Sequence, residues 1–171
     1  MPPNPDCHNA AAPSNEYLAG CCRNAEANCC KDGYLFLTRE EFQNLNQYCH
    51  AVKSELQEFQ ERITDCGAYA LYDQRTRCQF LDSNDHCRLH DLGLKPTECF
   101  WWPAHVYLAK TGDLEIRVAT CCSGCGMLTS NCEHIQRVVE QARAIGLNTL
   151  KAFRRRITYG EEYRVVSPLL E

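Results

Sequence analysis

Paired cysteines constrain this chain more than any other feature of its sequence. Cysteine accounts for 14 of the 171 residues, and adjacent pairs stand at Cys21-Cys22, Cys29-Cys30 and Cys121-Cys122. Neighbouring cysteines are poor disulfide partners for each other, because the small ring they would close departs from the preferred disulfide geometry. Thiols grouped in this way are typical of soft ligands gathered around metal. The pattern therefore predicts metal-binding loops.

The composition predicts a globular chain of about one domain. Hydrophobic residues make up 44% and charged residues 23%, which is ordinary for a protein with a buried core. The formal net charge of −4 argues against general attraction to nucleic acid. The one basic run, Arg154-Arg155-Arg156, is interpreted as a solvated helix face rather than as a phosphate or partner contact.

The N-terminal sequence, MPPNPDCHNAAAPSNEY, lacks a basic region followed by an apolar stretch, so we predict no secretory signal. No apolar run approaches the ~18 residues of a membrane-spanning helix. We therefore expect a cytoplasmic protein without membrane contact, where thiols stay reduced and cysteine groups indicate metal or redox chemistry. A mature secreted form would favour a disulfide framework instead, and that alternative stays open.

We expect three segments: a flexible arm over 1–19, a cysteine-cluster domain over 20–149 and a C-terminal extension over 150–171 that packs on the domain or extends from it. Thr38 and Glu41 form a capping box that opens a helix. Its apolar stripe recurs at steps of three and four residues and consists of Phe42, Leu45, Cys49, Val52, Leu56, Phe59 and Ile63. The stripe predicts one core helix of about 26 residues, ended near Gly67.

Beyond this helix the elements are shorter. Residues 68–72 and 79–81 are brief apolar runs, with a turn at 82–85, as expected where ligands replace packed structure. The runs 106–108 and 114–118 flank a turn with Gly112 and predict a β-hairpin. A second capping box, Ser130 to Glu133, opens a helix that ends near Gly146, and a short helix follows around 150–156. The predicted fold class is α+β, in a small single domain.

The first half of the chain carries an ordered motif. Its pieces are Gly20-Cys21, Cys29-Cys30, Leu37-Thr38-Arg39-Glu40-Glu41, Cys78-Gln79-Phe80-Leu81, Cys87-Arg88-Leu89-His90, Lys95-Pro96-Thr97-Glu98-Cys99 and Pro103. In this order, the chain resembles the YkgJ-type cysteine-cluster family, described as zinc- or iron-chelating domains. It departs from that pattern in the six residues between Cys22 and Cys29, and in Lys95, where the family commonly has arginine.

The resemblance implies a metal-binding module. One branch of the wider family is similar to flagellin lysine methylases, in which the motif is associated with an iron–sulfur cluster. The candidate ligands are Cys21, Cys22, Cys29, Cys30, Cys78, Cys87 and Cys99. We expect them to bind an iron–sulfur cluster of the 4Fe-4S type or iron, with zinc as the alternative. His90 is a further candidate ligand or a hydrogen-bond donor to sulfur, and a simple surface or core histidine is an equal alternative.

Physical chemistry supports the same interpretation. Thiolates packed together repel, and burying them is costly unless a metal supplies the countercharge. Seven thiols exceed the needs of one tetrahedral site, so one four-thiolate cluster with spare thiols and two neighbouring ions both stay open. Ordinary buried free cysteines are the remaining alternative for Cys78, Cys87 and Cys99.

A second group of cysteines lies beyond the motif and consists of Cys121, Cys122, Cys125 and Cys132. Four thiols in so short a stretch predict a second metal site or a contribution to a shared one, with a reversible CxxC dithiol as the alternative. Cys49 lies on the apolar stripe and is expected to pack in the core. Cys66 is ambiguous, and Cys7 is interpreted as incidental.

The sequence indicates that the protein binds metal more clearly than it indicates which reaction, if any, the protein catalyses. Phe100-Trp101-Trp102 is expected to roof the core beside the metal, and no nucleotide, hydrolase or metalloprotease motif is present. Catalytic residues therefore stay unassigned. We expect a redox or electron-transfer role, or cluster-assisted catalysis, with a protein redox partner or enzyme subunit. The alternatives are a zinc-binding structural or interaction module, and metal storage or delivery.

Overall fold

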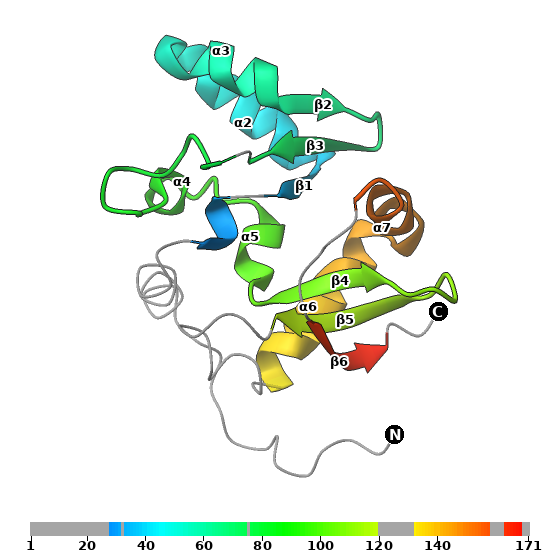
Figure 1. The fold of residues 1–171 in the computed structure, drawn as a ribbon. Coiled ribbons are helices and arrows are strands. Elements are labelled where there is room, and N and C mark those ends of the chain that lie inside the picture. The colour runs from blue at the N-terminus through cyan, green and yellow to red at the C-terminus, as the bar shows by residue number, and fades with distance from the viewer. Residues whose placement is uncertain (1–27, 32, 75, 120–131, 158–162, 169–171) are drawn as a thin grey trace.

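The computed structural model describes residues 28–31, 33–74, 76–119, 132–157 and 163–168. Within these ranges the predicted α+β class is confirmed, with six α-helices and two three-stranded antiparallel sheets (Figure 1). No helix in the described ranges is long and apolar enough to cross a membrane. The predicted arm 1–19 and Ser130 of the second capping box lie outside the described residues.

The first sheet has the order β1-β3-β2, formed by β1 (Tyr34–Thr38), β3 (Tyr69–Asp73) and β2 (Ile63–Asp65). The capping box predicted at its junction with α2 (Arg39–Ala51) is confirmed. Glu41 N donates to Thr38 Oγ1 at 3.2 Å, and Thr38 N donates to Glu41 Oε2 at 2.8 Å. Two backbone N–H groups at the helix start are thereby satisfied.

The single helix of about 26 residues predicted from the apolar stripe is wrong. Helix α2 ends at Ala51, Val52 leaves helical geometry with φ −101° and ψ 79°, and α3 (Lys53–Arg62) begins one residue later. Ile63 then enters strand β2 and pairs with Tyr72 on β3. The β-branched Ile63 and Thr64 favour a strand, whose backbone groups β3 satisfies. Because the break is short, the buried positions keep their helical spacing across it.

The second sheet has the order β4-β5-β6. Strands β4 (Ala104–Leu108) and β5 (Leu114–Ala119) form the predicted hairpin, with Gly112 at φ +90° in its turn. Strand β6 (Tyr163–Pro168) pairs with β5 and was not predicted. Helices α6 (Cys132–Ile145) and α7 (Leu147–Arg154) confirm the two predicted later helices, and Gly146 separates them at φ +102°.

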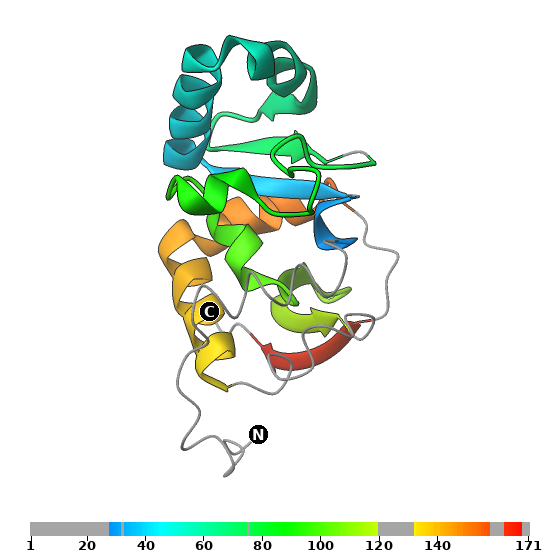
Figure 2. The same ribbon diagram turned by 90° about the vertical axis from the view of Figure 1, so that its left-hand side faces the viewer.

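The sheet of β1, β2 and β3 lies between two hydrophobic cores. Phe36 packs into one core, where its ring lies 5.5 Å from Tyr69 and 5.2 Å from Phe153. Leu35 and Leu37, on the opposite face of β1, pack into the other core. Side chains alternate across a strand, so this continuous apolar run serves both faces. Figure 2 shows the sheet between α2 and α3 on one side and α7 on the other.

A buried ion pair joins the two cores. Arg154 Nη2 on α7 donates to Glu98 Oε1 on α5 (Thr97–Trp101), and each side chain is only 2% exposed. Phe36 N on β1 donates to Glu98 Oε2, and His105 Nδ1 on β4 lies 3.8 Å from Glu98 Oε1. Burial by itself raises the pKa of Glu98, but the charge of Arg154 and the nearby His105 side chain outweigh it, so the pKa lies below its usual value.

The interpretation of the whole basic run as a solvated face is wrong for Arg154. Leu150, Phe153 and Arg154 occupy the inward face of α7, at the spacing of three and four residues that one helix face requires. Arg155 and Arg156 are exposed, as predicted.

We predict that Arg154→Met lowers the free energy of unfolding by about 3–5 kcal/mol, because Glu98 stays buried without its counter-charge. Arg155→Met is the matched control, since Arg155 is exposed one residue later, and its effect should stay within about 0.5 kcal/mol. Urea titrations followed by circular dichroism, at equal metal loading, measure both. Equal effects of the two substitutions would contradict the stabilising role of the pair.

Candidate metal centre

Four cysteines from four short segments lie in one neighbourhood. Cys30 ends the 3₁₀ turn η2 (Asn28–Cys30), Cys78 follows β3, Cys87 precedes α4 (Arg88–Asp91) and Cys99 lies on α5. All four belong to or pack against the hydrophobic core beside α2 and α3. Cys30 acts electrostatically on the thiols of each of the other three. The structure thus brings together four of the seven candidate ligands from the motif.

Backbone hydrogen bonds hold these segments against one another. Cys78 N donates to Cys30 O at 2.6 Å, so the turn bearing Cys29 and Cys30 lies directly beside the loop that follows β3. Leu81 and Cys87 form an isolated antiparallel bridge, and Arg88 N donates to Phe80 O at 3.0 Å. The loop therefore closes into a narrow ribbon that carries Cys78 and Cys87 at its two ends.

Hydrogen-bond donors surround two of the sulfur atoms. The backbone N–H of Phe80 and the hydroxyl of Tyr72 both act to lower the pKa of Cys78, and the Tyr72 hydroxyl donates to Gln79 Oε1 at 3.3 Å. The backbone N–H groups of Leu89 and His90 act to lower the pKa of Cys87, and His90 N donates to Cys87 O at 3.0 Å. Donors directed at sulfur stabilise its negative charge and are a usual second layer around metal-bound thiolates.

Burial acts in the opposite direction on the same thiols. Burial, followed by the nearby Cys30, raises the pKa of Cys78 to about 12. Burial followed by Cys30 also raises the pKa of Cys87 and Cys99, whereas the Lys95 ammonium lowers both. Without a bound cation the thiols therefore stay protonated near neutral pH, and a metal ion would displace their protons.

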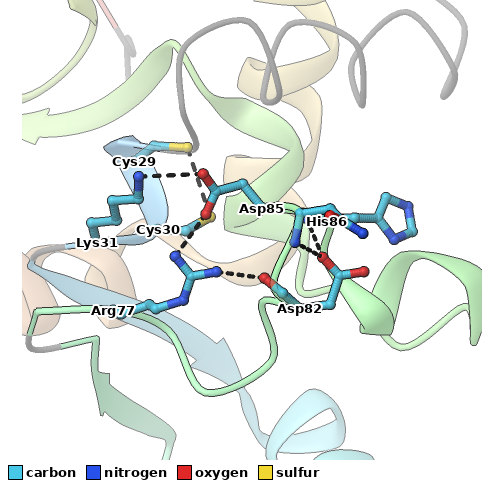
Figure 3. A network of polar contacts seen from close by, with 8 residues as sticks. Cys29, Cys30, Lys31, Arg77, Asp82, Asp85 and His86 are labelled. Atoms are coloured by element: carbon cyan, nitrogen blue, oxygen red, sulfur yellow. Dashed lines mark hydrogen bonds and ion pairs between the residues drawn. The ribbon is translucent and has the colours of Figure 1, made fainter.

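A charged network fixes the loop between Cys78 and Cys87 (Figure 3). Lys31 Nζ lies 3.4 Å from Asp85 Oδ2, and Arg77 Nη1 donates to Asp85 Oδ1 at 2.6 Å. Arg77 Nη2 also donates to Asp82 O, while Asp82 Oδ1 accepts from the backbone N of His86 at 3.0 Å. Because Lys31 directly follows Cys30, Asp85 ties two cysteine-bearing segments together. The turn predicted at 82–85 is confirmed.

Two glutamates, one on α2 and one on α3, bind the other segments that carry cysteines. Glu41 Oε1 accepts from Thr97 N at 2.6 Å, so the carboxylate that caps α2 also holds the start of α5 with Cys99. Glu55 on α3 accepts a hydrogen bond from Arg88, and Arg88 Nη2 donates to Gln79 O at 2.8 Å. The residues that follow Cys78 and Cys87 are therefore both held against α3.

His90 lies next to the site, with its ring centroid 6.0 Å from that of Phe100. Its Nδ1 is buried and has no hydrogen-bond partner. Burial, followed by the charge of Lys95, lowers the pKa of His90, which favours a neutral ring. A neutral imidazole could serve as a ligand or as a donor, so both roles considered from the sequence are chemically open.

The other cysteines occupy several environments. Cys29 Sγ lies 3.8 Å from Cys30 Sγ, Cys49 is fully buried in the core as predicted, and Cys66 Sγ lies 3.2 Å from Arg156 Nη1. The backbone of Cys132 begins α6. Outside the described residues lie Cys7, Cys21, Cys22, Cys121, Cys122 and Cys125.

The described side chains do not form a closed ligand shell. In these ranges, no group of three or more His, Cys, Asp or Glu side chains is arranged to hold a metal ion. The four neighbouring cysteines therefore do not yet form a site, and their sulfur atoms would have to move closer together to bind a metal ion or cluster. They are Cys30, Cys78, Cys87 and Cys99. Their donor chemistry fits a metal ion or cluster, since four thiolates are the usual ligand set of an iron–sulfur cluster or of structural zinc.

In the aromatic segment after Cys99, Trp101 packs into the core, as predicted. Trp101 is buried, and its Nε1 donates to Gln141 Oε1 on α6 at 2.8 Å. His134 Nε2 lies 2.9 Å from Trp101 O, which further fixes α5 against α6.

Three functional positions were missed from the sequence. Tyr72, Glu55 and Asp85 hold or contact the cysteine segments, but their partners are distant in sequence or depend on loop geometry. The alternation within 69–73 carried a partial signal for Tyr72, because it places residues 70 and 72 on one strand face.

Comparisons of the chain with protein-family models, curated proteins and solved structures give no match. The resemblance to the YkgJ-type family therefore stays a prediction from the motif.

We predict that Cys78 in the metal-free protein reacts slowly with iodoacetamide at pH 8. A pKa of about 12 against an ordinary 9.0 leaves about 10³-fold less thiolate, and the thiolate is the reactive form. Time-resolved alkylation with peptide mapping should show Cys78 reacting at least roughly 100-fold more slowly than free glutathione. A rate similar to that of glutathione would contradict the burial of this thiol.

Proposed function

We propose that this protein binds an iron–sulfur cluster, of the 4Fe-4S type, through Cys30, Cys78, Cys87 and Cys99. The supporting observation is that four thiols from four separate segments lie in one partly buried neighbourhood. Four cysteine thiolates are the common ligand set of such clusters. When bound, a cluster supplies one-electron exchange, so we propose a redox or electron-transfer role, or cluster-assisted catalysis.

The chain's own residues would bind the cluster, exclude water and balance charge. Phe80 and Trp101 are buried in the cores on either side of the cysteine segments, which lowers the local dielectric. The Lys95 ammonium lies 4.9 Å from the centroid of the Phe100 ring and acts favourably on the ionised forms of Cys87 and Cys99. The surroundings thus combine apolar shielding with positive charge, the two features that tune the potential of a cluster.

The larger ligand set of the motif is part of this proposal. Cys29 stands beside Cys30, and we propose it with Cys21 and Cys22 as spare or exchangeable thiols. A second site or a shared one would use Cys121, Cys122, Cys125 and Cys132. Of this group, the described backbone of Cys132 begins α6, and the contact of His134 with Trp101 O attaches the start of α6 to α5.

A second candidate function is a zinc-binding structural or interaction module. It is favoured by the short elements that carry the cysteines, since η2 has three residues and α4 has four. A four-thiolate zinc ion would stabilise such a region without redox chemistry. Metal storage or delivery is a third candidate, and it predicts variable metal loading.

The proposed partners follow from the chemistry. An electron-transfer role needs a protein redox partner or a larger enzyme in which this chain is a subunit. We propose that it acts in the cytoplasm, where thiols stay reduced. The net charge of −4 gives no support for a nucleic-acid partner.

The first test is anaerobic purification without a metal-binding tag, followed by a visible spectrum and analysis of iron, zinc and acid-labile sulfide. Iron with matching sulfide and a bleachable brown colour is the expected result. Stoichiometric zinc without sulfide would reject the cluster and favour the structural module. Variable, high metal content would favour storage.

We predict that Cys78→Ser and Cys99→Ser each lose most of the bound iron and sulfide, because each removes one proposed ligand. Cys49→Ser is the matched control, since Cys49 is also a buried thiol beside the same core but lies on α2 away from the cysteine loops. It should keep the wild-type metal content. Full metal content in both ligand variants would reject the assignment.

We also predict that Asp85→Asn speeds metal loss to a chelator by about 10–100-fold, because it weakens the ties from Lys31 and Arg77. Asparagine tolerates the φ of +58° at this position, so the backbone is spared. Ser83→Ala, in an exposed position of the same turn, is the control and should leave the rate unchanged. Stopped-flow loss of visible absorption measures all three proteins, and equal rates would remove Asp85 from the site's support.

A further inference from the structure

Cys66 and Arg156 meet at the surface, at a place that the proposed metal centre does not use. Cys66 lies in the turn between β2 and β3, and its backbone N donates to Tyr69 O at 2.9 Å. Arg156 lies two residues beyond the end of α7, and its Nη1 donates to Cys66 Sγ at 3.2 Å. The thiol is half-buried and the guanidinium is exposed, so a small reagent in the solvent can reach both.

The buried ring of Tyr69 packs on the inner side of this pair. Tyr69 is 4% exposed, and its ring centroid lies 5.5 Å from that of Phe36 and 5.9 Å from that of Phe153. Cys66 packs against the same core, and Arg156 N donates to Phe153 O at 3.0 Å. Backbone and ring contacts thus hold Tyr69 next to both members of the pair.

The Tyr69 hydroxyl is a buried donor without an acceptor. It has no hydrogen-bond partner among the residues that the structure describes. Buried polar groups are normally hydrogen-bonded, and leaving one unsatisfied costs stability. The Cys66 sulfur and the Arg156 guanidinium both act electrostatically on this hydroxyl, as expected of close neighbours. An oxygen atom on Cys66 Sγ would supply the acceptor that the hydroxyl lacks, and the guanidinium would be a second donor to that oxygen.

We propose that Cys66 is a peroxide-sensitive thiol whose sulfenic acid is held by hydrogen bonds from Tyr69 and Arg156. The Cys66 thiolate attacks one oxygen of hydrogen peroxide, so that an S–O bond forms and the O–O bond breaks. The sulfur loses two electrons to the peroxide, and the leaving hydroxide takes up the proton that the thiol released, which gives water. This inference does not rest on the proposed metal, because Cys66 is not among its ligands and Tyr69 packs in the other core.

The test treats the anaerobically purified full chain with a short pulse of hydrogen peroxide in the presence of dimedone, which forms a stable adduct with sulfenic acids. Trypsin then yields the peptides 63–75 and 40–53, whose single cysteines are Cys66 and Cys49. Cys49 is the internal comparison, because burial raises its pKa to about 12. We expect the adduct on Cys66 and none on Cys49. No adduct on Cys66, or equal labelling of the two cysteines, would overturn the proposal.

Two variants test the donors separately. Tyr69→Phe keeps the ring and removes the hydroxyl, so dimedone added after increasing delays should show the sulfenic acid decaying about 2–10-fold faster than in the wild type. Arg156→Gln removes the charge and should slow formation of the adduct by about 3–10-fold. Arg155→Gln is the matched control, since Arg155 is exposed one residue earlier, and it should behave as the wild type.

Wild-type formation and decay of the sulfenic acid in either donor variant would overturn the proposal, because Cys66 would then be an exposed thiol only. Arg156 is exposed, so Arg156→Gln decides the outcome by itself should Tyr69→Phe fail to fold. Iron and sulfide are quantified on the same samples, which keeps the result at Cys66 distinct from the outcome for the proposed cluster.

Discussion

The buried pair of Glu98 and Arg154 is the interaction on which the arrangement of this fold depends most. Its carboxylate receives a backbone N–H from β1 and a guanidinium from α7, and it lies one residue before Cys99. A buried pair adds little net stability compared with apolar packing, but losing one partner is costly. We infer that its role is registration: it fixes α5 between the two cores, and with α5 the position of Cys99 relative to the other thiols.

The first sheet explains why one charged contact can matter in this way. Strands β1 and β3 have a core on each face, so α7 packs on the side opposite α2 and α3. Helix α5 contacts both cores, one through Cys99 and the other through Trp101. The cysteine loops are attached to α2 and α3 through Glu41 and Glu55, while Glu98 attaches α5 to α7. The thiols thus lie between the segments that Glu41 and Glu55 hold against α2 and α3 and the segment that Glu98 holds against α7. A change in either core can therefore alter the spacing of the thiols without touching one of them.

Sequence reasoning succeeded where the cause of a structure is local. The Thr38 capping box, the turn with Gly112 and the helix that ends near Gly146 each depend on a few neighbouring residues, and the structure confirms all three. The break at Val52 carries no proline or glycine signal, because the apolar stripe continues across it. The burial of Arg154 depends on a partner 56 residues away, and β6 depends on pairing with β5. The grouping of the central cysteines was predicted from their order, whereas Tyr72 and Asp85 required the packed loops to be seen.

The cysteine site combines two opposing influences on its sulfur atoms. Burial and mutual proximity hold the pKa values of Cys78, Cys87 and Cys99 high, which favours neutral thiols. Backbone N–H groups, the Tyr72 hydroxyl and Lys95 favour negatively charged sulfur instead. Natural sequences tend to be locally consistent, and conflicts of this kind concentrate at functional sites. A bound cation would resolve this conflict, since it would displace the protons and supply the missing positive charge. This is the physical argument for a metal or cluster over four unligated thiols.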